Sequence, residues 1–189
     1  MILERSFYER DARAVAPELL NKVLVAGPRS GRIVEVEAYA GEEDEGSHGH
    51  RGMTRRTEVM FGPPGHLYVY FTYGMHWCAN AVCGPDGVCS AVLLRALEPL
   101  SGVDAMWLAR PKARRERDLA SGPAKLTQAL GIGGTHNGAD LVAGDAGVAI
   151  HDDGTPPPVR PERSRRIGLT RGVEHEWRWC VPGNEHVSR

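Results

Sequence analysis

Long apolar segments, cysteine pairs and an excess of positive charge are all missing from this sequence of 189 residues, and each absence excludes a class of protein. Because no run of about 18 apolar residues occurs, no membrane-spanning helix is predicted. Residues 1–5 lack the apolar stretch of a signal peptide, so we expect a cytoplasmic protein, nucleoid-associated if it is bacterial. The four cysteines form no CxxC pair, which predicts buried, reduced thiols rather than disulfides or a zinc site.

The charge balance limits the partners that such a protein can have. Lys and Arg number 23 against 24 Asp and Glu, for a net charge of -1, and phosphate binding normally needs a basic surface. The charges are nevertheless segregated along the chain, because two basic runs are separate from an acidic stretch over 35–45. The two runs are either solvated faces or a phosphate-binding surface that the net charge of the whole chain conceals. The first run holds Arg110, Lys112, Arg114, Arg115 and Arg117, and the second holds Arg160, Arg163, Arg165, Arg166 and Arg171.

The composition is that of one folded domain. Apolar residues make up 41% of the sequence, enough for a hydrophobic core, and charged residues make up 25%, which excludes a wholly disordered chain. Asp11 can cap a first helix, the segment 101–104 resembles a capping box for a second, and Pro123 opens a third that Gly131 ends. With no repeat and no long linker, the sequence predicts one α+β domain over 1–189 around an antiparallel sheet. Its strands are expected over 22–26, 32–39, 66–72, 76–83, 88–97, 147–151 and 176–181.

Two glutamates in one predicted strand are candidates for chemistry. Glu35 and Glu37 alternate with valines, so both project from the same face. The pattern alone favours a solvated face with two ordinary surface charges, because half-exposed strands commonly alternate in this way. If the face is buried, the carboxylates need partners or a chemical task. Tyr39 shares this face, and a carboxylate beside an aromatic ring could bind a planar ligand.

Three tyrosines lie on or next to a predicted hairpin. Tyr68 and Tyr70 share one strand face, where packing in the core is the favoured interpretation. Tyr73 falls beside Gly74 at the tip that Met75 completes. A bulky aromatic side chain at an exposed tip can act as a wedge between base pairs, although the pattern alone makes this the minority interpretation.

Polar residues interrupt two otherwise apolar strands. Arg95 needs an anionic partner if it is buried, and a pair with Glu35 or Glu98 fits the pattern as well as a phosphate site does. Asn80 is interpreted first as a satisfied core amide. A histidine pair at i, i+2 in the glycine-rich loop, His48 and His50, is weak support for a metal site, and no metal is expected.

Taken together, several segments in order along nearly the whole chain resemble the alkyladenine (3-methyladenine) DNA glycosylase family. No single segment is specific, but their combination is highly specific. They are Gly31–Tyr39 with Asp44, Glu45, Ser47 and His48; Gly65–Met75 with Asn80; Leu93–Pro99; Gly122–Leu126 with Gln128–Leu130, Asp140 and Leu141; and Arg166–Gly168.

The resemblance implies a compact α+β domain on a curved antiparallel sheet, with packed helices and a β-hairpin that protrudes into the DNA minor groove. It implies a monofunctional enzyme that flips alkylated or deaminated purines out of duplex DNA and hydrolyses the N-glycosidic bond, leaving an abasic site. The substrate class would be 3-methyladenine, 7-methylguanine, hypoxanthine and ethenoadenine. The expected partners are damaged double-stranded DNA and a water nucleophile, with no cofactor, and the protein is expected to be a monomer.

The same resemblance implies roles for five residues of the base pocket. Glu37 would be the general base that activates water. Tyr39, His48 and Tyr70 would enclose the extruded base, and Asn80 would border the pocket and disfavour guanine through its exocyclic amine. Stacking between electron-rich rings favours cationic, alkylated purines, and a carboxylate can both stabilise the positively charged sugar and deprotonate the water.

Further roles concern the DNA. Tyr73, with Met75, would fill the gap left by the flipped nucleotide, and Arg95 would lie near that nucleotide and its phosphate. The sequence departs from the family pattern at His76–Trp77 and at Arg178–Val181, so the contacts at the hairpin base and the damage spectrum are not fixed by the resemblance.

Two other functions remain open on the sequence. The first is a non-catalytic module on the same fold that binds nucleic acid or a modified base through its tyrosines, for which a carboxylate at Glu37 would have no purpose. The second is a glycoside hydrolase that uses Glu35 and Glu37 as its carboxylate pair, which leaves Tyr73 unexplained.

Overall fold

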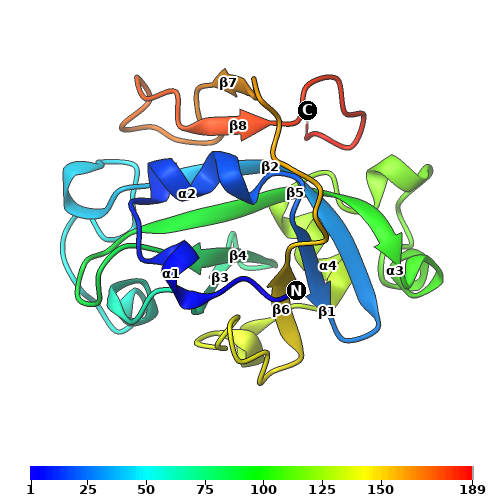
Figure 1. Ribbon diagram of the computed structural model, residues 1–189, viewed down its shortest axis with the longest axis horizontal. Coiled ribbons are helices and arrows are strands. Elements are labelled where there is room, and N and C mark those ends of the chain that lie inside the picture. The colour runs from blue at the N-terminus through cyan, green and yellow to red at the C-terminus, as the bar shows by residue number, and fades with distance from the viewer. Residues whose placement is uncertain (189) are drawn as a thin grey trace.

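A curled antiparallel sheet is the centre of the structure, a computed structural model that describes residues 1–188 (Figure 1). The strands follow the spatial order β3, β4, β5, β2, β1, β6, and β8 joins β2 and carries β7. The α+β fold of one domain is thereby confirmed. The strands are β1 (Val23–Ala26), β2 (Arg29–Tyr39), β3 (Leu67–Thr72), β4 (His76–Val82), β5 (Ala91–Ser101), β6 (Val148–His151), β7 (Glu162–Ser164) and β8 (Arg178–Cys180).

Strand β2 is paired on both sides where it carries the two glutamates. It pairs with β5 along one side, from Ser30 to Tyr39, and on the other side its first residues pair with β1 and Glu35–Glu37 pair with β8. Figure 1 shows β8 beside β2 at one border of the molecule. Glu35 and Glu37 are both fully buried. The prediction of a solvated face was therefore wrong, because segments that come from near the end of the chain meet the two carboxylates at Ile167 and Ser188.

Residues 1–188 form four short α-helices, of which α2 packs against β2 and β5 and α4 packs against β4 and β5. The Asp11 cap is confirmed, since its Oδ1 accepts a hydrogen bond from the Arg13 backbone N–H at 2.8 Å. The prediction of a capping box at Ser101 was wrong, because Ser101 ends β5 and its hydroxyl is hydrogen-bonded to the Ser30 hydroxyl. The helices are α1 (Arg5–Tyr8), α2 (Ala12–Leu19), α3 (Val103–Ala109) and α4 (Pro123–Leu130), with 3₁₀ turns η1 (Gly41–Glu43), η2 (Glu58–Phe61), η3 (Glu116–Asp118) and η4 (Gly134–His136).

Most strand boundaries differ from the prediction by one or two residues, those of β2 and β5 differ by more, and β7 was not predicted. Strand β2 begins at Arg29, because only Gly27 and Pro28 form the turn after β1, with Gly27 at a φ of +56°. Strand β5 begins at Ala91 rather than at residue 88 and continues to residue 101, since a turn holds the Val88 N–H on the Pro85 carbonyl. These shifts leave the site residues on the strands where they were expected.

The core has a main cluster along the sheet and a smaller one beside β3. The smaller cluster contains Met60, Phe61, Tyr68, Val82, Cys89 and Ala91, and Tyr70 packs against it. All four cysteines are buried with free thiols, as predicted. Within residues 1–188 no helix is long and apolar enough to cross a membrane.

Candidate active site

A cavity of about 310 Å³ opens beside the β3–β4 hairpin. Its wall is rich in aromatic side chains and comes mainly from the end of β2, the loop that follows β2, strands β3, β4 and β5, and the loop that follows β7. This volume is at the lower end of the range for small-molecule sites, which suits one flat ring system. The lining includes Tyr39, His48, Tyr68, Tyr70, Cys78, Asn80, Arg95 and Ile167.

The Glu37 carboxylate lies directly behind this wall. It is fully buried, and three groups from the lining are bonded to it. The Tyr39 hydroxyl donates to Oε2 at 2.9 Å, the Ile167 backbone N–H donates to Oε1 at 2.8 Å, and Arg95 Nη1 is 3.2 Å from Oε1. Oε1 therefore has the Ile167 hydrogen bond and the Arg95 ion pair, whereas Oε2 has the Tyr39 hydroxyl as its one donor within residues 1–188.

Glu35 and Glu37 lie two residues apart in one strand, yet their ionisation differs. Burial is the largest influence on Glu37 and raises its pKa above the ordinary value, although Arg95, Ile167 and Tyr39 oppose the shift. Burial acts on Glu35 too, but the charge of Arg95 and the hydrogen bonds around Glu35 outweigh it and lower its pKa. Glu35 is therefore a fixed anion, whereas Glu37 takes up a proton more readily. Divergent environments of this kind separate an acid–base group from a structural one.

Four hydrogen bonds hold the Glu35 carboxylate. Its Oε1 accepts from Arg95 Nε at 2.8 Å, from Arg178 Nε at 2.7 Å and from the Ser188 hydroxyl at 2.8 Å, while its Oε2 accepts from the Ser188 N–H at 2.7 Å. A carboxylate with this many charged and backbone donors is a weak base. The arrangement disfavours the hypothesis of a glycoside hydrolase with two working carboxylates.

Arg95 connects the two glutamates. The predicted pair with Glu35 is confirmed, and the guanidinium also reaches Glu37, whereas Glu98 instead accepts from the Asn184 side chain at 3.0 Å. Arg95 also borders a second cleft of about 400 Å³ next to the first cavity. The phosphate contact suggested by the resemblance stays a prediction.

The aromatic side chains predicted to enclose a base lie together around the cavity. His48 and Tyr70 meet edge to face with ring centroids 4.5 Å apart, and Tyr68 and Tyr70 stack at 5.4 Å. His48 Nδ1 is 3.3 Å from the Tyr68 hydroxyl. Loss of hydration, followed by the charge of Arg56, lowers the pKa of His48. Burial raises the pKa of Tyr39 well above its ordinary value, so its hydroxyl remains a donor.

Strand β4 contributes Asn80 and Cys78 to the cavity from one face. Asn80 is buried, and its side-chain N–H donates to the Tyr68 carbonyl at 3.1 Å, which confirms the interpretation of a satisfied amide. Burial raises the pKa of the Cys78 thiol, so this group is neutral. Discrimination against guanine by Asn80 stays a prediction.

The tip of the β3–β4 hairpin is apolar and exposed. Tyr73 is 83% exposed and Met75 is 69% exposed. The turn requires a positive φ at Tyr73 (+51°) and at Gly74 (+67°), and the Met75 N–H donates to the Thr72 carbonyl at 3.2 Å. For a tyrosine this left-handed conformation costs about 1–2 kcal/mol, and strain of this kind is commonly found at functional sites. The predicted protruding hairpin is confirmed.

Sequence reasoning assigned no role in the site to three residues that contribute to it, although two of them lie in the segment Arg166–Gly168 that supports the resemblance. The Ile167 amide acts through its backbone, which leaves no signal in residue types. Arg56 lies 5.4 Å from the Tyr70 ring centroid and donates to the Phe71 carbonyl at 3.4 Å, next to the hairpin. Arg166, which was grouped with a basic surface run, is instead fully buried against Asp44. The assignment of Arg166 to a possible phosphate-binding face was therefore wrong.

Cationic side chains lie on the other side of the hairpin as well. Arg110 and Lys125 line the second cleft together with His76, and Arg110 and Lys112 line a further groove that includes Met75 and Trp77. The first basic run therefore approaches the hairpin at Arg110 and Lys112. Within residues 1–188, no group of three or more His, Cys, Asp or Glu residues is placed to hold a metal.

The fold and the cavity together define a class of protein: one α+β domain with an aromatic cavity in front of a buried carboxylate, and with an exposed aromatic hairpin tip. A family model described as Methylpurine-DNA glycosylase matches residues 6–185, and the chain belongs to the methylpurine-DNA glycosylase family. The resemblance stated from the sequence motifs is confirmed.

Curated relatives cover the chain almost completely. A protein of Burkholderia lata named "Putative 3-methyladenine DNA glycosylase" is 58% identical over 99% of this chain and 91% of its own length. Proteins with the same name from Streptomyces avermitilis and Carboxydothermus hydrogenoformans are each 46% identical, over 98% and 100% of this chain and 90% and 100% of their own lengths.

Proposed function

We propose that this protein is a monofunctional DNA glycosylase that flips alkylated or deaminated purines out of duplex DNA and hydrolyses their N-glycosidic bond with a water activated by Glu37. The observation that carries the proposal is the buried Glu37 carboxylate with a raised pKa, bonded to three lining groups of the aromatic cavity. Membership of the methylpurine-DNA glycosylase family supports the same reaction.

The cavity suits an extruded base. A base inside a duplex is out of reach of any side chain, and extruding it costs a few kcal/mol. Tyr39, Tyr70 and His48 offer aromatic surfaces that replace lost stacking. An alkylated purine carries positive charge or is a better leaving group, and aromatic faces attract cations. These contacts would favour damaged over normal purines.

The water would be held at Oε2, the less occupied oxygen of the Glu37 carboxylate. Oε1 accepts a hydrogen bond from the Ile167 N–H and is paired with Arg95 Nη1, so the attacking water would donate to Oε2, beside the Tyr39 hydroxyl. The water oxygen then bonds to the sugar C1′, its proton passes to Glu37, and the electrons of the C1′–N bond leave with the purine. The carboxylate also stabilises the positive charge that develops on the sugar.

The hairpin tip would fill the space that the flipped nucleotide vacates. The exposed side chains of Tyr73 and Met75 present an apolar wedge of the type that proteins insert between base steps. No lysine is among the lining residues of the base cavity in the described chain. A Schiff base with the sugar needs such an amine, and we therefore propose hydrolysis without strand cleavage.

Base release from duplex oligonucleotides tests the proposal. The oligonucleotides carry hypoxanthine, ethenoadenine or 3-methyladenine, and alkali treatment reveals abasic sites. We expect release by the wild type and a loss of at least 100-fold in Glu37→Gln, a general-base effect of the usual size, with binding of the lesion DNA retained. Glu45→Gln, at an exposed position, is the matched control and should retain full activity.

Three outcomes would contradict parts of the proposal. Equal release by the wild type and Glu37→Gln would remove the catalytic role. DNA binding without any release by the wild type would favour the alternative of a non-catalytic module that binds nucleic acid or a modified base. Strand cleavage without alkali would refute the monofunctional assignment.

A further inference from the structure

A buried ion pair lies behind the cavity and is not used by the proposed mechanism. Asp44 and Arg166 are both fully buried and form a bidentate pair, with Nη1 2.6 Å from Oδ2 and Nη2 2.7 Å from Oδ1. Arg166 Nη1 also donates to the Ala38 carbonyl and Nη2 to the Gly172 carbonyl, both at 3.0 Å. All four hydrogens of its two terminal nitrogens are therefore engaged.

The pair joins segments that form different parts of the cavity wall. Asp44 accepts hydrogen bonds from the Ala40 N–H at 3.2 Å and from the Gly46 N–H at 2.9 Å, which shapes the loop between Tyr39 and His48. On the other side, Arg166 is the residue before Ile167, whose N–H is bonded to Glu37. Fixing Arg166 therefore fixes the peptide that presents this donor.

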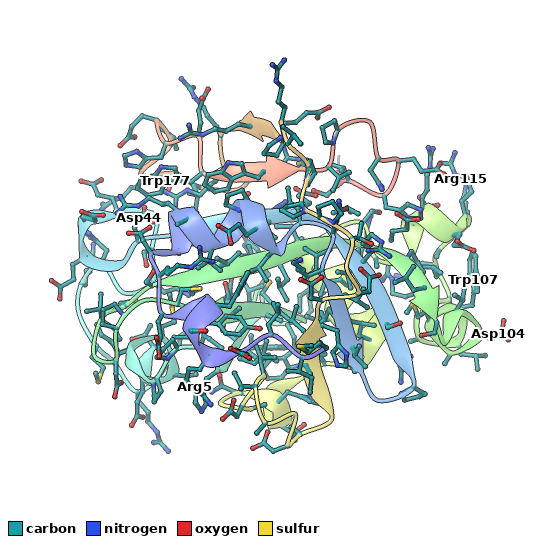
Figure 2. The ribbon with its side chains drawn as sticks, viewed as in Figure 1. Arg5, Asp44, Asp104, Trp107, Arg115 and Trp177 are labelled. Atoms are coloured by element: carbon teal, nitrogen blue, oxygen red, sulfur yellow. The ribbon has the colours of Figure 1, made fainter. Side chains whose placement is uncertain are left out.

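The Arg166 guanidinium also lies over two aromatic rings. Its central carbon is 4.7 Å from the Tyr39 ring centroid and 5.1 Å from that of Trp177. Figure 2 shows Asp44 and Trp177 at the same end of the molecule, away from Arg115. Tyr39 is thus restrained twice, by this contact on its ring and by the hydrogen bond from its hydroxyl to Glu37.

We propose that Asp44 and Arg166 are positioning residues of the glycosylase, which hold the Ile167 amide and the Tyr39 ring in register with the Glu37 carboxylate. Neither residue touches the reacting atoms. The inference rests on the proposed function, because it assigns a purpose to groups that surround Glu37. Stability alone does not account for the pair, since buried ion pairs are often no more stabilising than apolar residues and the buried Nε of Arg166 lacks any partner within residues 1–188.

The main test is the pH dependence of single-turnover base release by Arg166→Lys. Lysine keeps the charge but cannot form the bidentate pair, donate to both carbonyls and stack as a plane. The Ile167 N–H stabilises the ionised form of Glu37, so losing it should move the acidic limb of the profile to higher pH. The plateau rate should fall roughly 10- to 100-fold, as expected for a small misplacement of catalytic groups.

Gly172→Ala perturbs the same pair without changing any charge. A Cβ at Gly172, which has a φ of +60°, would lie 3.0 Å from Arg166 Nη2 and 3.1 Å from Asp44 Oδ1. Gly172 does not line the cavity, and this variant should show the same shift of the acidic limb in a milder form. It keeps the test decisive if Arg166→Lys does not fold.

The matched control is Lys22→Gln, which breaks a different ion pair with a buried lysine. Lys22 Nζ is 2.7 Å from Asp152, and neither residue lines the base cavity. This variant should lower the melting temperature and leave the pH profile unchanged. An unshifted acidic limb in folded Arg166→Lys and Gly172→Ala would overturn the positioning role. Retained activity in Glu37→Gln would instead overturn the proposed function, so the two failures are distinguishable.

Discussion

Replacing Glu35 with glutamine should lower stability and replacing Glu37 should not, although the two residues lie close together on one strand. Glu35 is an anion with four donors around it, so Glu35→Gln removes the charge that compensates Arg95 and Arg178. Glu37 is a carboxyl that burial discourages from ionising, and Glu37→Gln imitates its protonated form. We expect a destabilised protein in the first case and an equally or more stable one in the second.

The size of the Glu35 effect follows from its partners. Breaking a buried ion pair by removing one partner costs about 3–5 kcal/mol. Arg95 keeps Glu37 as a second partner, and Arg178 is partly exposed, so the lower end, about 3 kcal/mol, applies. For a chain of this length each kcal/mol shifts the melting temperature by about 2–4 °C, which gives a decrease of about 6–12 °C.

The stability change caused by each substitution should vary with pH, in a direction set by the pKa shift of the glutamate that is replaced. The pKa of Glu35 is lowered in the folded state, so its stabilisation is present above the unfolded value of about 4.3 and is lost as the pH falls. The deficit of Glu35→Gln should therefore shrink in acid. The pKa of Glu37 is raised, so the native state loses stability as the pH rises through that folded value. The advantage of Glu37→Gln should therefore grow with pH.

Thermal melts followed by circular dichroism, supported by urea unfolding, measure both effects at acidic and neutral pH. Glu45→Gln, an exposed neighbour, should stay within about 0.5 kcal/mol of the wild type. The reasoning is refuted if Glu35→Gln and Glu37→Gln lower the melting temperature by similar amounts. It is also refuted if the Glu35→Gln deficit persists unchanged in acid.

Three further predictions concern the site and the DNA surface. Tyr39→Phe keeps the ring but removes the hydroxyl that donates to Glu37, so the pKa of Glu37 should rise further. Base release on the acidic limb of the pH–rate profile should fall about 10-fold. An acidic limb at the same pH as in the wild type would contradict this prediction. Asparagine tolerates a positive φ better than tyrosine, so Tyr73→Asn should raise the free energy of unfolding in urea titrations by up to about 1 kcal/mol. The same variant should extrude a fluorescent lesion more weakly in stopped-flow traces. A clear loss of stability would argue against strain at the tip. DNA affinity should fall steeply with salt, and Lys125→Ala should reduce the slope of log K against log salt by about 1 in fluorescence anisotropy titrations. Arg160→Ala, at a residue that does not line the second cleft, should leave the slope unchanged. Equal slopes for the wild type and Lys125→Ala would exclude a phosphate contact at that lysine.

Local patterns in the sequence determined much of the fold. The Asp11 cap, the α4 helix between Pro123 and Gly131, and the hairpin tip at Tyr73–Met75 all depend on interactions within a few residues. Such interactions are written in the identity and spacing of neighbours, so they are readable without coordinates. Motifs in order along the chain also identified the family, because their combination is far more specific than any one of them.

The tertiary structure decided which of those residues could meet, and how. Alternation in β2 suggested two solvated glutamates, but β8 covers that edge and Arg95, Arg178 and Ser188 arrive from distant parts of the chain. The same long-range packing buried Arg166, a residue that its basic neighbours marked as surface. Hydrogen bonding and burial set the charge state of a carboxyl, and both depend on groups remote in sequence. The sequence therefore determined that a glutamate stands at position 37, while the folded chain alone determined that its pKa is raised and that of Glu35 is lowered.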